Sequence, residues 1–359
     1  MKIPPLQIGK IIVPLPIIQG GMGVRVSLAG LAAAVANEGG IGTIASVGLG
    51  DIEQSKRDFD GVSREALIYE IRRARALTDG PIAVNSMGVL SNALDLVKTL
   101  VREGIKIIVS GASLPLRLPE MVDDDSVNLV PIVSSGRAAD IVLKTWSKRY
   151  NRTADAVVLE GPLAGGHLGF SAEEMEDLEG HSLAVLLPKV LAAVKSFEDK
   201  FGRRIPVIAG GGVFTGADIA RLLQAGAAGV QMATRFVCTD ECEVSREFKQ
   251  TYLDAEEKDI VIIKSPVGLL GRAVRNPFLR NLEADTLDKI SCPYRCLATC
   301  DVANARYCIA LALSNACQGN MEKGLVFCGQ NAFRIHEIVS VKALMAELRA
   351  GLEAYPEAT

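Results

Sequence analysis

The sequence is poor in aromatic residues and histidines and has no long uninterrupted hydrophobic run. Aromatic side chains make up 5% of the 359 residues and there are three histidines, although 49% of the residues are hydrophobic. Without a run of about 18 apolar residues, a membrane-spanning helix is disfavoured. The opening segment, MKIPPLQIGKIIVPLPII, is interrupted by four prolines and lacks the basic and then helical stretches of a signal peptide. We therefore expect no membrane partner and a cytoplasmic location.

Clustered positive charge is also absent. The formal net charge is −3, and Lys and Arg are spread along the chain. Proteins that bind nucleic acids concentrate positive charge on one face to contact phosphates, so we expect no nucleic-acid partner. A small-molecule substrate is the expected ligand, and a homodimer is a candidate assembly.

Short aliphatic runs are abundant, and helical patterns follow them. Eight such runs occupy residues 16–23, 40–46, 81–88, 105–113, 127–135, 154–161, 205–212 and 228–236. Continuous apolar runs are typical of parallel strands buried on both faces, and eight strand–helix units predict an α/β fold of the (β/α)8 TIM-barrel type. A doubly wound sheet shares the alternation but favours an early G-x-G-x-x-G turn, and QGGMGV lacks that spacing.

This alternation stops between residues 238 and 306. The stretch is rich first in charge and then in cysteine, and helical patterns return at YCIALALSNACQG and VSVKALMAELRAGLEAY. We therefore predict a barrel domain of residues 1–237 and 307–359. Residues 238–306 would form an inserted cap, or substrate domain, beside the barrel mouth.

Glycines and neutral polar residues follow the predicted strands, where a barrel places its active site. Glycines 210–212 follow the seventh strand, and Ala233 and Thr234 follow the eighth; loops at these two places commonly bind phosphate. Neutral side chains such as Asn85 and Ser134 suit hydrogen bonds to a flavin ring. FMN, with one phosphate and one ring system, is therefore the expected cofactor. A barrel that binds a sugar phosphate without redox chemistry is the alternative.

Four segments together resemble the nitronate monooxygenase family, which is related to FMN-dependent enoyl-acyl-carrier-protein reductases. They are PIIQGGMG, AVNSMG, EGPLAGGHLG and IPVIAGGGVFTGADIARLLQAGAAGVQMATRF. The resemblance implies a barrel that binds FMN beneath a cap. Leu163 departs from the family loop, which commonly carries a second glutamate there. Together, the strand ends and the resemblance predict these cofactor-binding residues: Gly20, Gly21, Met22, Asn85, Ser134, Glu160, Gly165, Gly166, Gly210, Gly211, Gly212, Ala233 and Thr234.

His167 is the predicted catalytic residue. A neutral imidazole can take a proton from a carbon acid or return one to a developing carbanion, and the resemblance implies a catalytic base that also binds substrate. The leading expected activity is oxidation of alkyl nitronates with dioxygen. The alternatives are reduction of enoyl-acyl-carrier-protein thioesters and reduction of quinones, both with NAD(P)H as the reductant.

Cysteines gather in the segment SCPYRCLATCDVANARYC. Cys292, Cys296 and Cys300 could share one helical face, and Cys308 follows. Converging thiolates can hold an iron–sulfur cluster or zinc, but the spacing matches neither C-x2-C pairs nor a ferredoxin run. We therefore expect buried thiols that pack in the cap and no metal, with a cluster at these four cysteines as the alternative.

Overall fold

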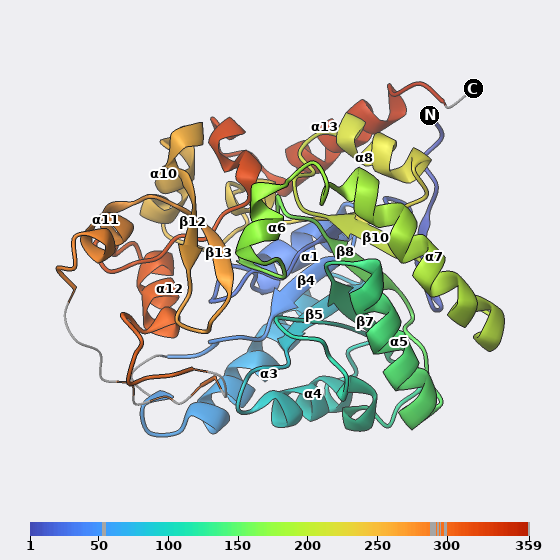
Figure 1. Ribbon diagram of the computed structural model, residues 1–359, viewed down its shortest axis with the longest axis horizontal. Helices are drawn as coiled ribbons and strands as arrows, with labels where there is room; N and C mark the ends of the chain where they lie inside the picture. Colours follow the sequence, from blue (N-terminus) through green and yellow to red (C-terminus); the bar gives the residue numbers. More distant parts are fainter. Residues whose placement is uncertain (52–54, 288–291, 293, 295, 298–299, 358–359) are drawn as a thin grey trace.

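The computed structural model describes all residues except 52–54, 288–291, 293, 295, 298–299 and 358–359 (Figure 1). Its centre is a sheet of eight parallel strands in the order β3-β11-β10-β8-β7-β6-β5-β4. The strands are β3 (Ile17–Gln19), β4 (Gly42–Ala45), β5 (Ile82–Met87), β6 (Ile107–Gly111), β7 (Asn128–Val133), β8 (Val157–Glu160), β10 (Val207–Gly210) and β11 (Gly229–Met232). Each falls within a predicted run.

The sheet closes between its first and last strands. The amide of Ile41, just before β4, donates to the carbonyl of Ile17 in β3 at 3.0 Å, and the Gln19 amide donates to the carbonyl of Ile41 at 2.9 Å. The predicted TIM barrel is therefore confirmed. Its interior is filled by aliphatic side chains such as Ile107, Val130 and Ile208, which leaves the strand ends as the place for a site.

Helices surround the barrel: α1 (Ala29–Asn37), α3 (Phe59–Leu77), α4 (Ala93–Arg102), α5 (Gly136–Tyr150), α7 (Leu183–Phe201), α8 (Gly216–Gln224) and α13 (Val341–Glu353). Local sequence sets their first turns. The Ser135 hydroxyl accepts from the Ala138 amide at the start of α5, and Thr215 and Asp218 form a capping box on α8. The last barrel helix, α13, packs against α8 and α1, although more than 100 residues separate it from β11.

A hairpin that the sequence analysis did not predict covers the amino end of the barrel. It consists of β1 (Leu6–Ile8) and β2 (Ile11–Val13). Leu6, Ile8 and Val13 pack in the same cluster as the inward-facing strand residues. The N-terminal amine contacts the opposite end of the chain. It donates to the Glu353 carbonyl at 2.7 Å and to the Tyr355 carbonyl at 2.6 Å. The proline-rich start of the chain is thus folded onto the barrel, with Leu6, Ile8 and Val13 in its core.

A second layer of structure lies beside the barrel mouth, on the left in Figure 1. It contains α10 (Arg246–Leu253), β12 (Ile260–Lys264), β13 (Leu270–Val274), α11 (Pro277–Glu283) and α12 (Ile309–Cys317). We call this layer the cap. Residues 307–359 contribute to both layers, since α12 packs with Phe278 and Leu279 of the cap while α13 packs on the barrel.

One strand joins the two layers. The segment β9 (Gly166–Leu168) leaves the barrel after β8 and pairs antiparallel with β13, so that the cap sheet has the order β12-β13-β9. Short elements complete the chain: α6 (Ala172–Glu176), α9 (Thr234–Val237), and the 3-10 turns at Leu118–Met121, Glu257–Asp259 and Gln330–Arg334. None of the helices described has both the length and the apolar composition needed to cross a membrane.

Candidate active site

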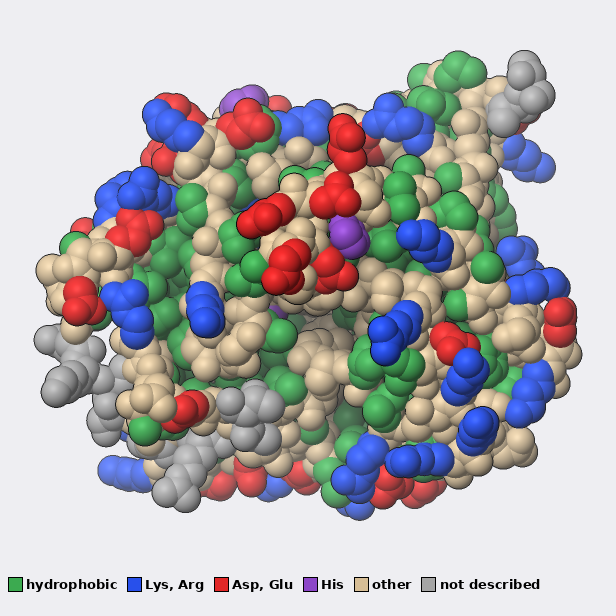
Figure 2. Space-filling model, viewed as in Figure 1, with side chains coloured by type: hydrophobic (Ala, Val, Ile, Leu, Met, Phe, Trp, Pro, Cys, Tyr) green, Lys and Arg blue, Asp and Glu red, His purple; other side chains and the backbone are tan. Residues whose placement is uncertain are grey.

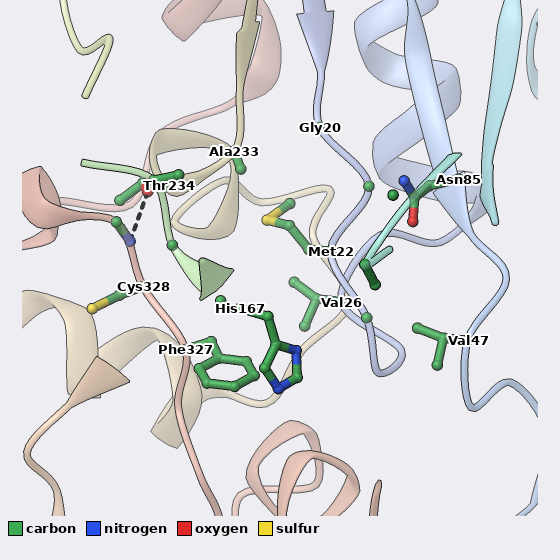
Figure 3. Close-up of a pocket in the computed structure, with 18 of the residues that line it drawn as sticks. Gly20, Met22, Val26, Val47, Asn85, His167, Ala233, Thr234, Phe327 and Cys328 are labelled. Atoms are coloured by element: carbon green, nitrogen blue, oxygen red, sulfur yellow. Dashed lines mark hydrogen bonds between the residues drawn. The ribbon is translucent and has the colours of Figure 1, made fainter. Parts of the chain in front are cut away.

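A pocket lies where the carboxyl ends of the barrel strands meet the cap, and the surface between the two layers is hollowed (Figure 2). The structure brings together there His167 and all but one of the predicted cofactor-binding residues: Gly20, Gly21, Met22, Asn85, Glu160, Gly165, Gly166, Gly210, Gly211, Gly212, Ala233 and Thr234. Figure 3 shows several of them around one space.

Ser134 is the exception, because it does not line the pocket. Strand β7 ends at Val133, so the strand alternation that points Ile132 into the pocket does not continue to Ser134. Ser134 instead lies against the loop after β9, where a Cβ added to Gly169 would be 3.2 Å from the Ser134 hydroxyl. Its position supports the loop from outside the pocket.

The glycine triplet lines the pocket and leaves two backbone amides without a hydrogen-bond partner among the described residues. Gly211 and Gly212 have φ values of +96° and +88°, which L side chains rarely adopt. Within the described part of the chain, no hydrogen bond engages either amide N–H, whereas the Gly212 carbonyl accepts from Asn331 Nδ2 at 2.7 Å. Consecutive free amides of this kind can bind an anion.

Close backbone contact fixes the neighbouring loop. A Cβ on Gly165 would be 2.5 Å from the Cys328 carbonyl carbon, so only glycine fits there. The Gly329 amide donates to Thr234 Oγ1 at 3.1 Å, the dashed line of Figure 3. The histidine loop, the end of β11 and the segment after Phe327 therefore meet at one point of the pocket wall.

His167 lies on β9, with its ring beside Phe327 (Figure 3). The two ring centroids are 5.1 Å apart in an edge-to-face arrangement. His167 Nε2 is 2.7 Å from Ser265 Oγ, and Ser265 is buried in the turn between β12 and β13. Burial lowers the pKa of His167 to about 4, so the imidazole is neutral at physiological pH.

Glu160 and Asn85 line the pocket, and their side chains form no hydrogen bond with the described part of the chain. Glu160 ends β8, is half-buried and lines the pocket. Burial raises the pKa of Glu160 to about 7, so the carboxyl can carry a proton near neutral pH. Asn85, on β5, offers an amide that can both donate and accept.

Arg272 holds the histidine loop from the cap side. This residue of β13 is only 2% exposed, and its guanidinium donates to the carbonyls of Pro162, at 2.7 Å, and Ala164. Burial lowers the pKa of Arg272, since the charge is desolvated without a carboxylate beside it. Leu163, at the family position of a glutamate, is one of the pocket residues.

Sequence reasoning missed Ser265, Arg272, Phe327 and Asn331. No local motif marks them, because each reaches the site through a strand pairing or loop contact with a segment far away in the sequence. The short turn SPVG is a recognisable turn signal, but it carries no information about which histidine the serine will contact.

The fold and the site define a TIM-barrel protein whose candidate active site lies between the strand ends and a cap. A family profile described as nitronate monooxygenase matches residues 5–106 and 92–351. The chain belongs to the nitronate monooxygenase family. Enzymes of this kind are flavin-dependent in general.

Curated relatives carry two different activities in their names. The chain is 31% identical over 269 residues to a (3aS,4S,5R,7aS)-5-hydroxy-7a-methyl-1-oxo-octahydro-1H-indene-4-carboxyl-CoA dehydrogenase of Mycobacterium tuberculosis. That match covers 75% of this chain and 65% of the relative, so a third of the relative's length lies outside it. A probable nitronate monooxygenase of Staphylococcus aureus is 24% identical over 293 residues, which cover 74% of this chain and 77% of the relative.

Solved structures resemble the whole chain. FabK from Thermotoga maritima has a TM-score of 0.75 and 28% identity, covering 95% of this chain and 93% of that one. A nitroalkane oxidase from Streptomyces ansochromogenes has a TM-score of 0.73 and 24% identity, covering 95% and 96%; at this identity, the likeness concerns the fold.

Proposed function

We propose that this protein is an FMN-dependent oxidoreductase in which His167 transfers the proton. The observation that carries the proposal is the arrangement of one pocket. Free amides of Gly211 and Gly212 follow β10, Thr234 follows β11, and a neutral, half-buried imidazole comes from the neighbouring loop. A phosphate site and a proton-transfer group in one pocket fit a phosphorylated redox cofactor with a substrate beside it.

The pocket residues fit FMN chemically. Gly211, Gly212 and Thr234 would hold the single phosphate, because backbone amides and a hydroxyl bind phosphate without a countercharge. Asn85 and Glu160 would face the ring system, since both present unpaired polar groups in a wall that is otherwise largely apolar. When bound, FMN accepts or donates the hydride or electrons of the reaction.

His167 would serve as the base that takes the α-proton of a neutral nitroalkane; a nitronate has already lost that proton, and His167 would then contact its anionic end. Its lone pair stays available because burial disfavours the imidazolium. Ser265 fixes the ring through Nε2, and Phe327 packs against its side. Directional contacts on two sides limit rotation of the ring, which keeps the proton-accepting atom in place when substrate binds.

An alkyl nitronate is the leading candidate substrate, with dioxygen as the final acceptor. The space around His167 is bordered by apolar side chains, including Val26, Val47 and Met22 (Figure 3). Such a surface suits a short alkyl group, while the imidazole faces the polar end of the substrate. Membership of the nitronate monooxygenase family supports this assignment.

An acyl thioester is the second candidate. The apolar wall of the pocket continues from Phe59 and Leu90 to Leu297, Ile309 and Leu313 of the cap side, which is a longer apolar surface than a short nitroalkane needs. The similarity to a dehydrogenase named for a carboxyl-CoA substrate and to FabK supports this candidate. Reduction of an enoyl thioester or of a quinone would then use NAD(P)H.

Spectroscopy of the purified protein tests the cofactor, and anaerobic mixing tests the substrate. We expect a yellow protein that releases FMN on denaturation. A colourless protein after reconstitution with FMN would contradict the proposal and favour a sugar-phosphate barrel without redox chemistry. Bleaching by an alkyl nitronate, with recovery in air, would support the leading substrate. Bleaching only by NADH or NADPH, with recovery by an enoyl-CoA or a quinone, would support the alternatives.

A further inference from the structure

Four of the eight cysteines surround a second cavity, which lies in the cap. Cys292, Cys296, Cys300 and Cys308 line this cavity of about 400 Å³. None of the four is in a disulfide. The sequence places them within 17 residues, and the fold places all four on the wall of one space.

The four thiols lie close enough to act on one another electrostatically. The pKa of Cys296 is raised to about 12, chiefly by burial and also by the neighbouring Cys308, Cys292 and Cys300. Burial also raises the pKa of Cys300 and Cys308, and Cys292 adds to both. The geometry that matters for a metal centre is that all four residues line one cavity, so that four cysteine sulfurs can face a single cluster.

Backbone contacts fix two of the four positions. The Ser91 amide donates to the Cys296 carbonyl at 3.1 Å, and Leu90 forms an antiparallel bridge with Leu297. Cys296 is therefore tied to the barrel loop after β5. Cys308 immediately precedes α12, where the amides of Leu311 and Ala310 partly offset the effect of burial on its pKa. Amides directed at a ligating sulfur are a common feature of iron–sulfur sites.

The spacing of the described side chains distinguishes between kinds of metal centre. Within the described part of the chain, no three His, Cys, Asp or Glu side chains come close enough to hold one metal ion. A single zinc ion needs about four ligands within bonding distance of one point, and the described side chains do not provide them. In an iron–sulfur cluster, inorganic sulfides connect the irons, so the cysteine sulfurs stand apart around it.

We propose that Cys292, Cys296, Cys300 and Cys308 bind an iron–sulfur cluster in the cap. Each thiol would release its proton to solvent as its sulfur bonds to one iron, which gives the four-cysteine ligand set that such clusters use. Cys296, Leu297 and Ile309 line both this cavity and the candidate active site. The cluster would therefore lie behind the wall of that pocket, but the proposal does not depend on the proposed flavin chemistry.

Anaerobic reconstitution of the full chain tests the site. The protein is incubated with ferric iron, a thiol reductant and sulfide, and then desalted, and iron, acid-labile sulfide and flavin are measured separately. We expect about two or about four iron atoms per chain with an equal amount of sulfide. After reduction, a low-temperature electron paramagnetic resonance signal distinct from a flavin radical should follow the iron content.

A matched pair of variants separates the four-cysteine site from adventitious iron. The double variant Cys300→Ser, Cys308→Ser should lose about tenfold or more of the bound iron, whereas Cys238→Ala, buried elsewhere in the core, should keep it. Circular dichroism checks that both fold, and Cys292→Ser provides a milder test. Iron without sulfide, equal loading of variant and control, or stoichiometric zinc in place of iron would each overturn the proposal.

Discussion

His167 Nε2 lies 2.7 Å from Ser265 Oγ, although 98 residues separate the two in the sequence. His167 belongs to the loop after a barrel strand, and Ser265 to the turn of a cap hairpin. The register that pairs Gly271 with His167 on β13 and β9 brings them together. The proton-transfer group proposed for the barrel is therefore oriented by the cap, which makes the cap part of the active site.

Ser265→Ala should slow turnover without releasing the flavin. The variant loses one hydrogen bond to a neutral ring, worth about 0.5–1.5 kcal/mol, which corresponds to about a 2- to 13-fold lower rate. The rate of anaerobic flavin reduction by the substrate that bleaches the wild type measures the effect. Ser265→Thr keeps the hydroxyl and should restore most of the rate; a rate equal to wild type in Ser265→Ala would show that the hydrogen bond does not position His167.

Turnover per bound flavin should stay nearly constant as the pH is lowered and fall only near pH 4. Because burial lowers the pKa of His167 from 6.5 to about 4, the basic form persists until the pH falls through about 4. The unfolded chain binds this proton more readily than the folded chain does. The contribution of neutral His167 to the free energy of unfolding is therefore present above pH 6.5 and is lost as the pH falls towards 4. A pH–rate profile taken after brief pH jumps checks this. A break near pH 6.5 that disappears in His167→Gln would contradict it.

Glu160→Gln should stabilise the protein at high pH. Burial raises the pKa of Glu160 from 4.5 to about 7, so the native state resists ionisation, and the stability present below pH 4.5 is lost as the pH rises through 7. This difference in pKa corresponds to about 3 kcal/mol at most. Melting temperatures at pH 5 and pH 8 measure the effect. The melting temperature of the variant should exceed that of wild type at pH 8 and lie closer to it at pH 5. An equal difference in melting temperature at both pH values would argue against a titrating carboxyl in the pocket.

Arg272→Met should loosen the histidine loop. Two buried carbonyls, of Pro162 and Ala164, lose their donor, and an unsatisfied buried acceptor costs about 1–3 kcal/mol. Urea unfolding gives the loss of stability, and hydrogen exchange locates it.

Arg275→Met is the matched control for that experiment, because Arg275 forms an exposed ion pair with Glu283 at 2.6 Å. Such pairs contribute about 0–1 kcal/mol. Equal destabilisation by both substitutions would mean that the contacts of Arg272 with the loop stabilise the fold no more than an exposed ion pair does.

The strand ends were the part of the site that could be predicted. Barrel strands run parallel, so residues just after each strand must meet at one edge, and Gly211, Thr234 and His167 do line one pocket. Ser134 was expected there for the same reason, yet β7 stops one residue earlier and the side chain contacts a loop instead. Errors of one residue at a strand end change which face a side chain occupies.

By itself, the sequence determined the barrel, because eight buried strands alternating with helices have few other ways to bury their apolar surfaces. It also determined the glycine turns, since only glycine tolerates the φ of Gly211 and Gly212. Only the tertiary structure decided that a cap hairpin supplies Ser265 and Arg272 and that four cysteines face one cavity. Those contacts depend on strand register and loop packing between distant segments, which no local pattern of residues encodes.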